Sequence, residues 1–174
     1  DTLLQGIDGN NIVGGYRDAS LSHIHAVLYN GSTWRTLNPP GATSGTAYGI
    51  EGNNIVGSYS DSTGSHGFLY NGSTWTPLDY PKAGAYNTYA YGIDGNNVVG
   101  RYRDGSGYHT FLYDGTTWTT LDYPGGNSTY AHGIDGNRIV GSYRDSDTTS
   151  HGFLYNGTTW TTLDYPGSIR TAAS

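Results

Sequence analysis

The feature that most constrains the fold is a nine-residue motif, Gly-Ile-Asp-Gly-Asn-Asn-Ile-Val-Gly, which the chain carries in four close copies. The copies open at Gly6, Gly49, Gly92 and Gly133, which lie 43, 43 and 41 residues apart. The only four tryptophans keep nearly the same step, with separations of 41, 43 and 42 residues. Self-similarity at a fixed period of this length is the signature of a repeat architecture. We therefore interpret the 174 residues as four units of one kind, with no second, unrelated domain.

Each unit contains four short strand candidates separated by turn signals. In the second unit the strand candidates are 46–50, 55–59, 66–70 and 74–78. The first and second are joined by Glu51-Gly52-Asn53-Asn54, and the third and fourth by Asn71-Gly72, which are sequences that favour tight hairpin turns. The 28 glycines and 17 tyrosines fit the same picture, because Gly suits turns and Tyr suits pleated strands. No window has the apolar spacing of a helix, so the sequence predicts an all-β protein.

Four strands in a unit of about 42 residues is typical of a propeller blade. We predict an all-β, four-bladed β-propeller with four antiparallel strands per blade, in a single domain over residues 1–174. The expected blades are approximately 1–42, 43–85, 86–127 and 128–167, followed by a tail at 168–174. Small first-strand residues such as Ala90 and Gly92 fit crowding near the axis, and ring closure would depend on packing between blades one and four. An open array or a β-solenoid is the alternative, and the tail is either a clasp or the start of a further unit.

Charge and hydropathy exclude several classes of partner. The net charge is −6 and the eight Lys and Arg are scattered, so we expect no nucleic acid partner. No apolar run approaches the roughly 20 residues that span a bilayer, so we expect no membrane span. The chain starts at Asp1 and contains no Met, which we interpret as a processed or trimmed N-terminus.

The repeated core motifs resemble a known family. The third strand of each unit opens with His25-Ala26-Val27, His66-Gly67-Phe68, His109-Thr110-Phe111 and His151-Gly152-Phe153. Together with the glycine-rich motif and the Asn-Gly-Thr-Thr-Trp-Thr-Thr-Leu-Asp-Tyr-Pro-Gly segment, these resemble the bacterial extracellular HAF repeat, named after its His-Ala-Phe core. The resemblance covers essentially the whole chain. It implies a secreted or cell-surface bacterial protein, but it supplies no activity and no catalytic residues.

Candidate binding residues gather on one face of the predicted blades. In an up-and-down blade, the loop between the second and third strands lies at the same end as the segment that leads to the next blade. These loops vary more than the tight turns at the opposite end, and sites usually lie on such loops. Rings can stack on sugar C–H faces, while planar polar groups bind paired hydroxyls. The candidate ligand-binding residues are Arg17, Asp18, Asp61, Tyr80, Arg103, Asp104, Tyr123, Arg144, Asp145 and Tyr165. The alternative is that Arg and Asp pair at the loop ends while Tyr covers the blade edge.

The four repeated histidines do not predict a shared metal ion. They open the third strand from the axis, so opposed copies should be roughly 20 Å apart or more. We expect each histidine to form hydrogen bonds within its own blade, with the aspartate of the same loop as partner. No cofactor is predicted, although Ca²⁺ held by Asp145, Asp147 and loop carbonyls is a candidate. The four tryptophans occupy identical places in every unit, which favours packing over sugar stacking.

Residues that break the repeat are the places to look for catalysis. His132 stands where other units have Gln5, Tyr48 or Tyr91, in the innermost strand, so His132, Tyr48 and Tyr91 form an axial candidate cluster. No nucleophile, base and orienting group can be assembled from the sequence, so an enzyme is the less favoured interpretation.

Three functional hypotheses follow. The leading one is a secreted, non-catalytic and multivalent carbohydrate-binding module, lectin-like, whose partners are glycans or other extracellular polymers. The second is a structural or self-assembling extracellular protein that forms filaments through an exposed strand or the tail. The third is a glycan-active enzyme with an axial site.

Overall fold

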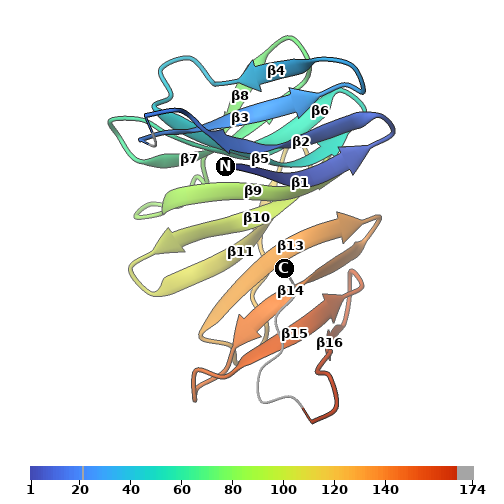
Figure 1. Cartoon of the computed structure of the whole chain (residues 1–174). Coiled ribbons are helices and arrows are strands. Elements are labelled where there is room, and N and C mark those ends of the chain that lie inside the picture. The colour runs from blue at the N-terminus through green and yellow to red at the C-terminus, as the bar shows by residue number, and fades with distance from the viewer. Residues whose placement is uncertain (21, 168–174) are drawn as a thin grey trace.

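A computed structural model describes residues 1–20 and 22–167 of the chain (Figure 1). The described part is all-β and consists of four antiparallel sheets of four strands each. Each sheet is an up-and-down meander built from one contiguous unit of the sequence. No helix long and apolar enough to cross a membrane occurs in the described ranges. The predicted all-β class and the four-strand units are confirmed.

The strands follow one another along the chain at regular intervals. The first sheet contains β1 (Thr2–Asp8), β2 (Asn11–Arg17), β3 (Ile24–Tyr29) and β4 (Trp34–Leu37). The second contains β5 (Ser44–Glu51), β6 (Asn54–Ser60), β7 (Ser65–Tyr70) and β8 (Trp75–Leu78). The third contains β9 (Tyr86–Asp94), β10 (Asn97–Asp104), β11 (Gly107–Tyr113) and β12 (Trp118–Thr120). The fourth contains β13 (Ser128–Asp135), β14 (Arg138–Arg144), β15 (Ser150–Tyr155) and β16 (Trp160–Thr162).

The tight turns follow from the turn residues in each unit. Between the first two strands of each sheet the glycine adopts a left-handed backbone, with φ between +55° at Gly9 and +58° at Gly95. Between the last two strands an Asn or Asp side chain accepts hydrogen bonds from backbone N–H groups two and three residues on. Asn71 Oδ1, for example, accepts from the N–H of Ser73 at 3.0 Å and of Thr74 at 2.8 Å.

Neighbouring sheets pack through their innermost strands and share cores. The joint between the second and third sheets buries Val56 and Leu78 of the second sheet with Ala90, Val98 and Phe111 of the third. The strand glycines allow the close approach: a Cβ added at Gly49 would lie 2.9 Å from the carbonyl oxygen of Tyr91. The small first-strand residues therefore have the packing role that the sequence predicted.

The ring of sheets is not closed. The extensive contacts between described sheets join the first with the second, the second with the third and the third with the fourth. In Figure 1 the first sheet lies at the top and the fourth at the bottom. Val140 and Leu163 of the fourth unit are 40% and 48% exposed, whereas Val56 and Leu78 are 0% and 2% exposed. The exposure of these apolar side chains shows that, among the residues the structure describes, the first and fourth sheets lack the packing that ring closure would require. The predicted tail, 168–174, lies outside the described residues.

Candidate functional site

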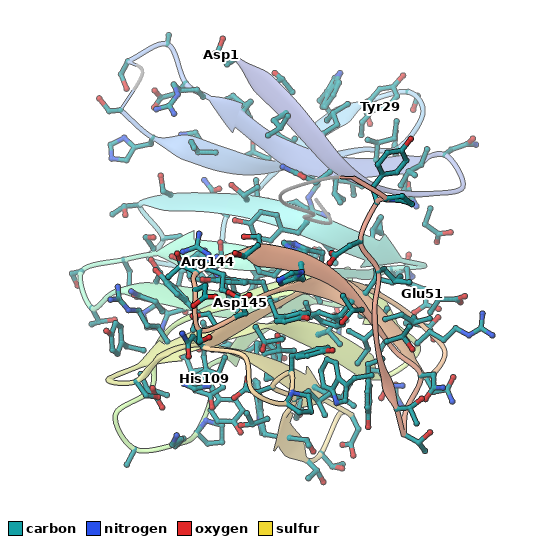
Figure 2. The ribbon with its side chains drawn as sticks, turned by 90° about the horizontal axis from the view of Figure 1, so that it is seen from below. Asp1, Tyr29, Glu51, His109, Arg144 and Asp145 are labelled. Carbon is teal, nitrogen blue, oxygen red and sulfur yellow. The ribbon has the colours of Figure 1, made fainter. Side chains whose placement is uncertain are left out.

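The varied loops and the tight turns lie at opposite ends of the sheets. Figure 2 shows His109, Arg144 and Asp145 on one side of the molecule, and Tyr29 and Glu51 on the other. We call the first side the loop face. The structure therefore brings the loop ends of the third and fourth sheets together, as the meander predicted.

Each loop between the second and third strands is closed by its own aspartate. Asp104 Oδ1 accepts hydrogen bonds from the backbone N–H of Ser106 at 2.8 Å and from its hydroxyl at 2.6 Å. Asp61 Oδ1 accepts in the same way from the N–H and hydroxyl of Thr63, at 2.7 and 2.6 Å. In both of these predicted ligand-binding residues, one carboxylate oxygen is therefore occupied by hydrogen bonds within its own loop.

The repeated histidines lie between two polar partners on the loop face. His109 contacts Asp104 Oδ1 through Nε2 at 3.0 Å and Asp122 Oδ2 through Nδ1 at 2.7 Å. His151 contacts Asp145 and Asp164 in the same manner, at 3.2 and 2.7 Å. In the first sheet Asn38 replaces the second aspartate, at 2.9 Å from His25 Nδ1. The predicted pairing of histidine with the loop aspartate is confirmed.

The electrostatics of these clusters follow from their hydrogen bonds. The hydrogen bond with Asp164, followed by that with Asp145, raises the pKa of His151 above its ordinary value. The Lys82 ammonium, at 2.8 Å, and the Ser106 donors hold the pKa of Asp104 far below its usual range. Hydrogen bonds led by Ser20 lower the pKa of Asp18 to about 2. Asp18 and Asp104 are therefore ionised at neutral pH and already accept hydrogen bonds from protein donors.

Two of the predicted ligand-binding tyrosines pack between sheets. Tyr80 stacks on Tyr102 with 3.9 Å between ring centroids, and its hydroxyl hydrogen bonds with Thr120 Oγ1 at 2.7 Å. Tyr123 stacks on Tyr143 at 3.6 Å and bonds with Thr162 Oγ1 at 2.7 Å. The third predicted tyrosine, Tyr165, is 77% exposed. Sequence reasoning missed the stacking because the Asp-Tyr-Pro segment follows a strand and resembles a loop.

The predicted arginines are spread along the loop face. The Arg103 guanidinium lies 5.1 Å from the ring centroid of Tyr108 and 5.8 Å from that of Tyr86. Arg17 and Arg144 are exposed at the ends of β2 and β14. The Arg144 carbonyl oxygen accepts a hydrogen bond from the Asn127 N–H at 2.7 Å.

A hollow of about 270 Å³ opens on the loop face between the second and third sheets. Its lining includes Thr63, His66, Asp79, Tyr86 and Asn87. Tyr86 is 45% exposed and the Asp79 side chain 51%, so a ring and a carboxylate are both accessible. We call this hollow the loop-face site.

The loop-face site exists because the segment leading into the third sheet is long. Seven residue steps separate Pro81 from Thr88, whereas five separate Pro124 from Thr129 at the next joint. The extra chain is absorbed by Asn87, whose φ of +53° is left-handed, and the ladder with β10 skips between Arg101 and Arg103. The unequal segment lengths are the sequence signal that could have located the site.

The axial candidates form a row along neighbouring innermost strands. The Tyr48 and Tyr91 ring centroids are 4.9 Å apart, and those of Tyr91 and His132 are 5.9 Å apart. Burial raises the pKa of both tyrosines and lowers that of His132, with Arg101 adding to the His132 shift. All three side chains are therefore uncharged at neutral pH.

Arg101 is the feature of this region that sequence reasoning did not place. Its guanidinium lies within 4.8 to 5.7 Å of four tyrosine ring centroids, those of Tyr89, Tyr91, Tyr108 and Tyr130. Cation–π contacts of this kind stabilise a partly desolvated charge. The arginine therefore has a packing role between the third and fourth sheets.

The aspartates do not converge on a metal position within residues 1–20 and 22–167, where no group of three or more His, Cys, Asp or Glu is arranged to hold an ion. Asp145 Oδ1 accepts from the N–H groups of Asp147 and Thr149, at 3.0 and 2.8 Å. The calcium site at Asp145 and Asp147 stays a prediction.

Comparisons with known proteins give little. No protein-family model matches the sequence, and no curated protein matches it either. Among solved structures, the chain is similar to a mutant of the Aleuria aurantia lectin in complex with alpha-methyl-L-fucoside. The TM-score is 0.46 and the identity 11%, over 94% of this chain and 76% of that chain. A similarity at this level assigns neither a family nor a ligand.

Proposed function

We propose that this protein is a carbohydrate-binding module whose four sheets are propeller blades and whose ligand occupies the loop-face site. The observation that carries the proposal is the hollow of about 270 Å³ in which an accessible tyrosine ring, a carboxylate and an amide lie together. Following the HAF resemblance, we also propose that it acts outside a bacterial cell.

The chemistry of the loop-face site suits a sugar. The Tyr86 ring offers an apolar face for the C–H side of a pyranose. Asp79 holds His66 Nδ1 at 3.0 Å through one oxygen, so its second oxygen is available to accept from a hydroxyl. The Asn87 amide can both donate and accept, which matches vicinal hydroxyls.

The proposal differs from the multivalent module, with up to four similar sites, that the sequence predicted. Between the third and fourth sheets, the shorter segment that leads into the fourth sheet is held by hydrogen bonds to β14 and the loop after it. The Asn127 N–H donates to Arg144 O, and the Asn127 Nδ2 donates to Asp145 O at 3.1 Å. The Tyr80 and Tyr123 rings stack on tyrosines of the neighbouring sheet, so they stabilise the joints between sheets and are not available to stack on a sugar. We therefore propose one principal site per chain.

A glycan array followed by calorimetry on the retained glycans tests the proposal. Tyr86→Ala should weaken binding about tenfold, equivalent to about 1.4 kcal/mol, because the stacking face is lost. Tyr86→Phe keeps the ring and should bind nearly as the parent does. Asn87→Gly should weaken binding while keeping the left-handed backbone, since glycine adopts positive φ readily.

The matched control is Asn96→Gly, the same replacement in the same sheet but in the exposed tight turn at the opposite end. Its affinity should equal that of the parent. Retention of no glycan on the array, or equal affinity of Tyr86→Ala and the parent, would refute the proposal.

A further inference from the structure

Two joints between sheets, the second with the third and the third with the fourth, share one set of contacts around a tyrosine. At the joint of the third and fourth sheets, Tyr123 stacks on Tyr143 and meets Trp160 edge-on, with ring centroids 5.4 Å apart. Its hydroxyl bonds with Thr162, and its backbone N–H donates to Thr129 Oγ1 at 2.9 Å. We call the receiving set, Thr129, Tyr143, Phe153, Trp160 and Thr162, the tyrosine socket of the fourth sheet.

The tyrosine socket of the third sheet repeats these contacts. Tyr80 stacks on Tyr102, meets Trp118 edge-on at 5.5 Å, and donates its N–H to Thr88 Oγ1 at 3.1 Å. The same geometry at two joints shows that the socket can be used repeatedly to receive the end of the preceding unit, whereas Pro39 occupies the tyrosine position at the joint of the first and second sheets.

The first sheet carries an equivalent socket although no sheet of the described chain packs on it as a preceding unit. Its members are Thr2, Tyr16, Val27, Trp34 and Thr36, and together with Leu4 and Arg35 they line a hollow of about 550 Å³. The Tyr16 hydroxyl hydrogen bonds with Thr36 Oγ1 at 3.3 Å, as that of Tyr143 does with Thr162 at 3.1 Å. Trp34 is 57% exposed. The first sheet is thus shaped to receive the end of another unit.

The fourth sheet presents the complementary end. Leu163-Asp164-Tyr165-Pro166 repeats Leu121-Asp122-Tyr123-Pro124 residue for residue. Val140 and Leu163, which match the fully buried Val56 and Leu78 of an internal joint, are 40% and 48% exposed. Within the described part of the chain, the innermost strand of the fourth sheet is also uncovered on the side away from the third sheet. A Cβ added at Gly133 would meet only Val140 of the same sheet within 4 Å, whereas one at the equivalent Gly92 would lie 3.2 Å from the Cα of Gly133 in the next sheet.

A second, independent set of contacts, at the tight turns, also joins each sheet to the one that follows it in the chain. Asp8 Oδ2 accepts the Gly52 N–H at 2.6 Å, and Asp94 Oδ2 accepts the Gly136 N–H at 2.9 Å. Each acidic turn residue therefore caps the turn glycine of the following sheet. Asp135 is the corresponding acid of the fourth sheet, and Gly9, with φ +55°, has the conformation of Gly136, with φ +57°.

From these two sets we propose that the fourth sheet of one copy docks on the first sheet of a second copy, repeating the internal joint head to tail. Tyr165 would enter the socket around Tyr16, Val140 and Leu163 would cover Leu4, and Asp135 would accept the Gly9 N–H. The occupant is a second copy because the chain itself carries both halves of the joint and, within residues 1–20 and 22–167, its first and fourth sheets do not pack on each other. The two surfaces differ, so the association is heterologous and extends to rings or filaments.

Sedimentation and light scattering of the 174-residue chain, without glycan, test the proposal. The average mass should rise with protein concentration. Leu4→Asp places a charge on the receiving face and Val140→Asp on the presenting face, and both positions are already solvent-accessible, at 45% and 40%. Each variant alone should stay monomeric, because a buried unpaired charge opposes docking.

An equimolar mixture of the two variants is the decisive arm. The intact presenting face of Leu4→Asp can dock on the intact receiving face of Val140→Asp, so the mixture should form a one-to-one dimer and nothing larger. Tyr86→Ala, on the loop face, should associate as the parent does. Circular dichroism melts confirm that each variant is folded.

A parent chain that stays monomeric at all concentrations would overturn the proposal, as would a mixture that fails to dimerise. A monomer whose melting temperature drops on either aspartate substitution would instead indicate closure of the ring within one chain, which also overturns it. These outcomes are separate from glycan binding, since Tyr86 and Asn87 lie outside both docking faces.

Discussion

Both ring nitrogens of each repeated histidine have polar partners, and in the third and fourth sheets both partners are carboxylates. In the fourth sheet the hydrogen bond with Asp164, followed by that with Asp145, favours the protonated ring and so raises the pKa of His151. The loop carboxylates in turn accept N–H and O–H donors that stabilise their ionised form, so their pKa values are lowered. At the scale of single residues, the loop face is therefore held by charge-assisted hydrogen bonds.

The pH dependence of stability follows from the directions of these shifts. Asp18, Asp61, Asp104 and Asp145 stabilise the fold above their ordinary pKa of 3.8, and this contribution is lost as pH falls through their lowered values, about 2 for Asp18. His151 stabilises below its ordinary pKa of 6.5, and its contribution is lost as pH rises through its raised value. We expect the melting temperature to be highest between these limits, as measured by calorimetry across pH.

Replacing His151 measures its own contribution to the dependence of the melting temperature on pH. His151→Gln should reduce the decline in melting temperature above the ordinary histidine pKa, while the acid-side contributions of Asp18, Asp61 and Asp104, which do not contact His151, should remain. An unaltered alkaline decline in His151→Gln would contradict this assignment.

At the scale of elements, a bulge in the innermost strand is matched to a glycine in the second strand of every sheet. The pairing register shifts between Leu4 and Gly6 in the first sheet and between Val99 and Gly100 in the third. The bulge pushes a carbonyl toward the neighbouring strand: a Cβ added at Gly100 would lie 1.9 Å from Tyr89 O and 2.8 Å from the Phe111 ring. The last glycine of the repeated motif is therefore required by the bulge.

Gly100→Ala tests this requirement. The added methyl would displace a strand carbonyl and a core ring, so we expect the free energy of unfolding to fall by about 3 kcal/mol, at the upper end of overpacking costs. Urea denaturation provides the measurement. Gly105→Ala, where nothing lies within 4 Å of the added Cβ, should be close to neutral. Equal stabilities of the two variants would show that the bulge tolerates a side chain.

At the scale of the whole molecule, each sheet is stabilised by its neighbours in the chain. In such arrays stability is approximately the sum of unit terms and nearest-neighbour interface terms. The second and third sheets have two neighbours each, whereas the first and fourth have one in this structure. The end sheets should consequently open at lower free energy than the middle ones.

Hydrogen exchange measures this difference. In dilute protein, amides of β13 to β16 should exchange faster than those of β9 to β12, even though both sets of strands follow the same repeat. At concentrations where copies associate, protection of the end sheets should rise toward that of the middle sheets. Equal exchange in all four sheets of the dilute protein would show that the interfaces contribute little.

Features formed within one repeat unit were predictable from the sequence. The contacts between sheets were predictable only in part. The strand limits and turns follow from short-range patterns, and so does the pairing of His109 with Asp104, because both residues lie within one unit. The open ring depends on how sheets are inclined to one another, which no motif encodes. The stacking of Tyr80 on Tyr102 and the enclosure of Arg101 by tyrosines of two sheets join different units, and neither could be read from one unit alone.

At the tight turns, the acidic residue of one sheet accepts a hydrogen bond from the turn glycine of the next sheet, and this arrangement has an evolutionary consequence. Because every unit supplies an acceptor forward and a donor backward, duplication of one unit within the gene adds a complete new joint without any compensating substitution. Array length can therefore change in a single genetic step, and the number of units would be free to vary among lineages while the contacts between them stay the same.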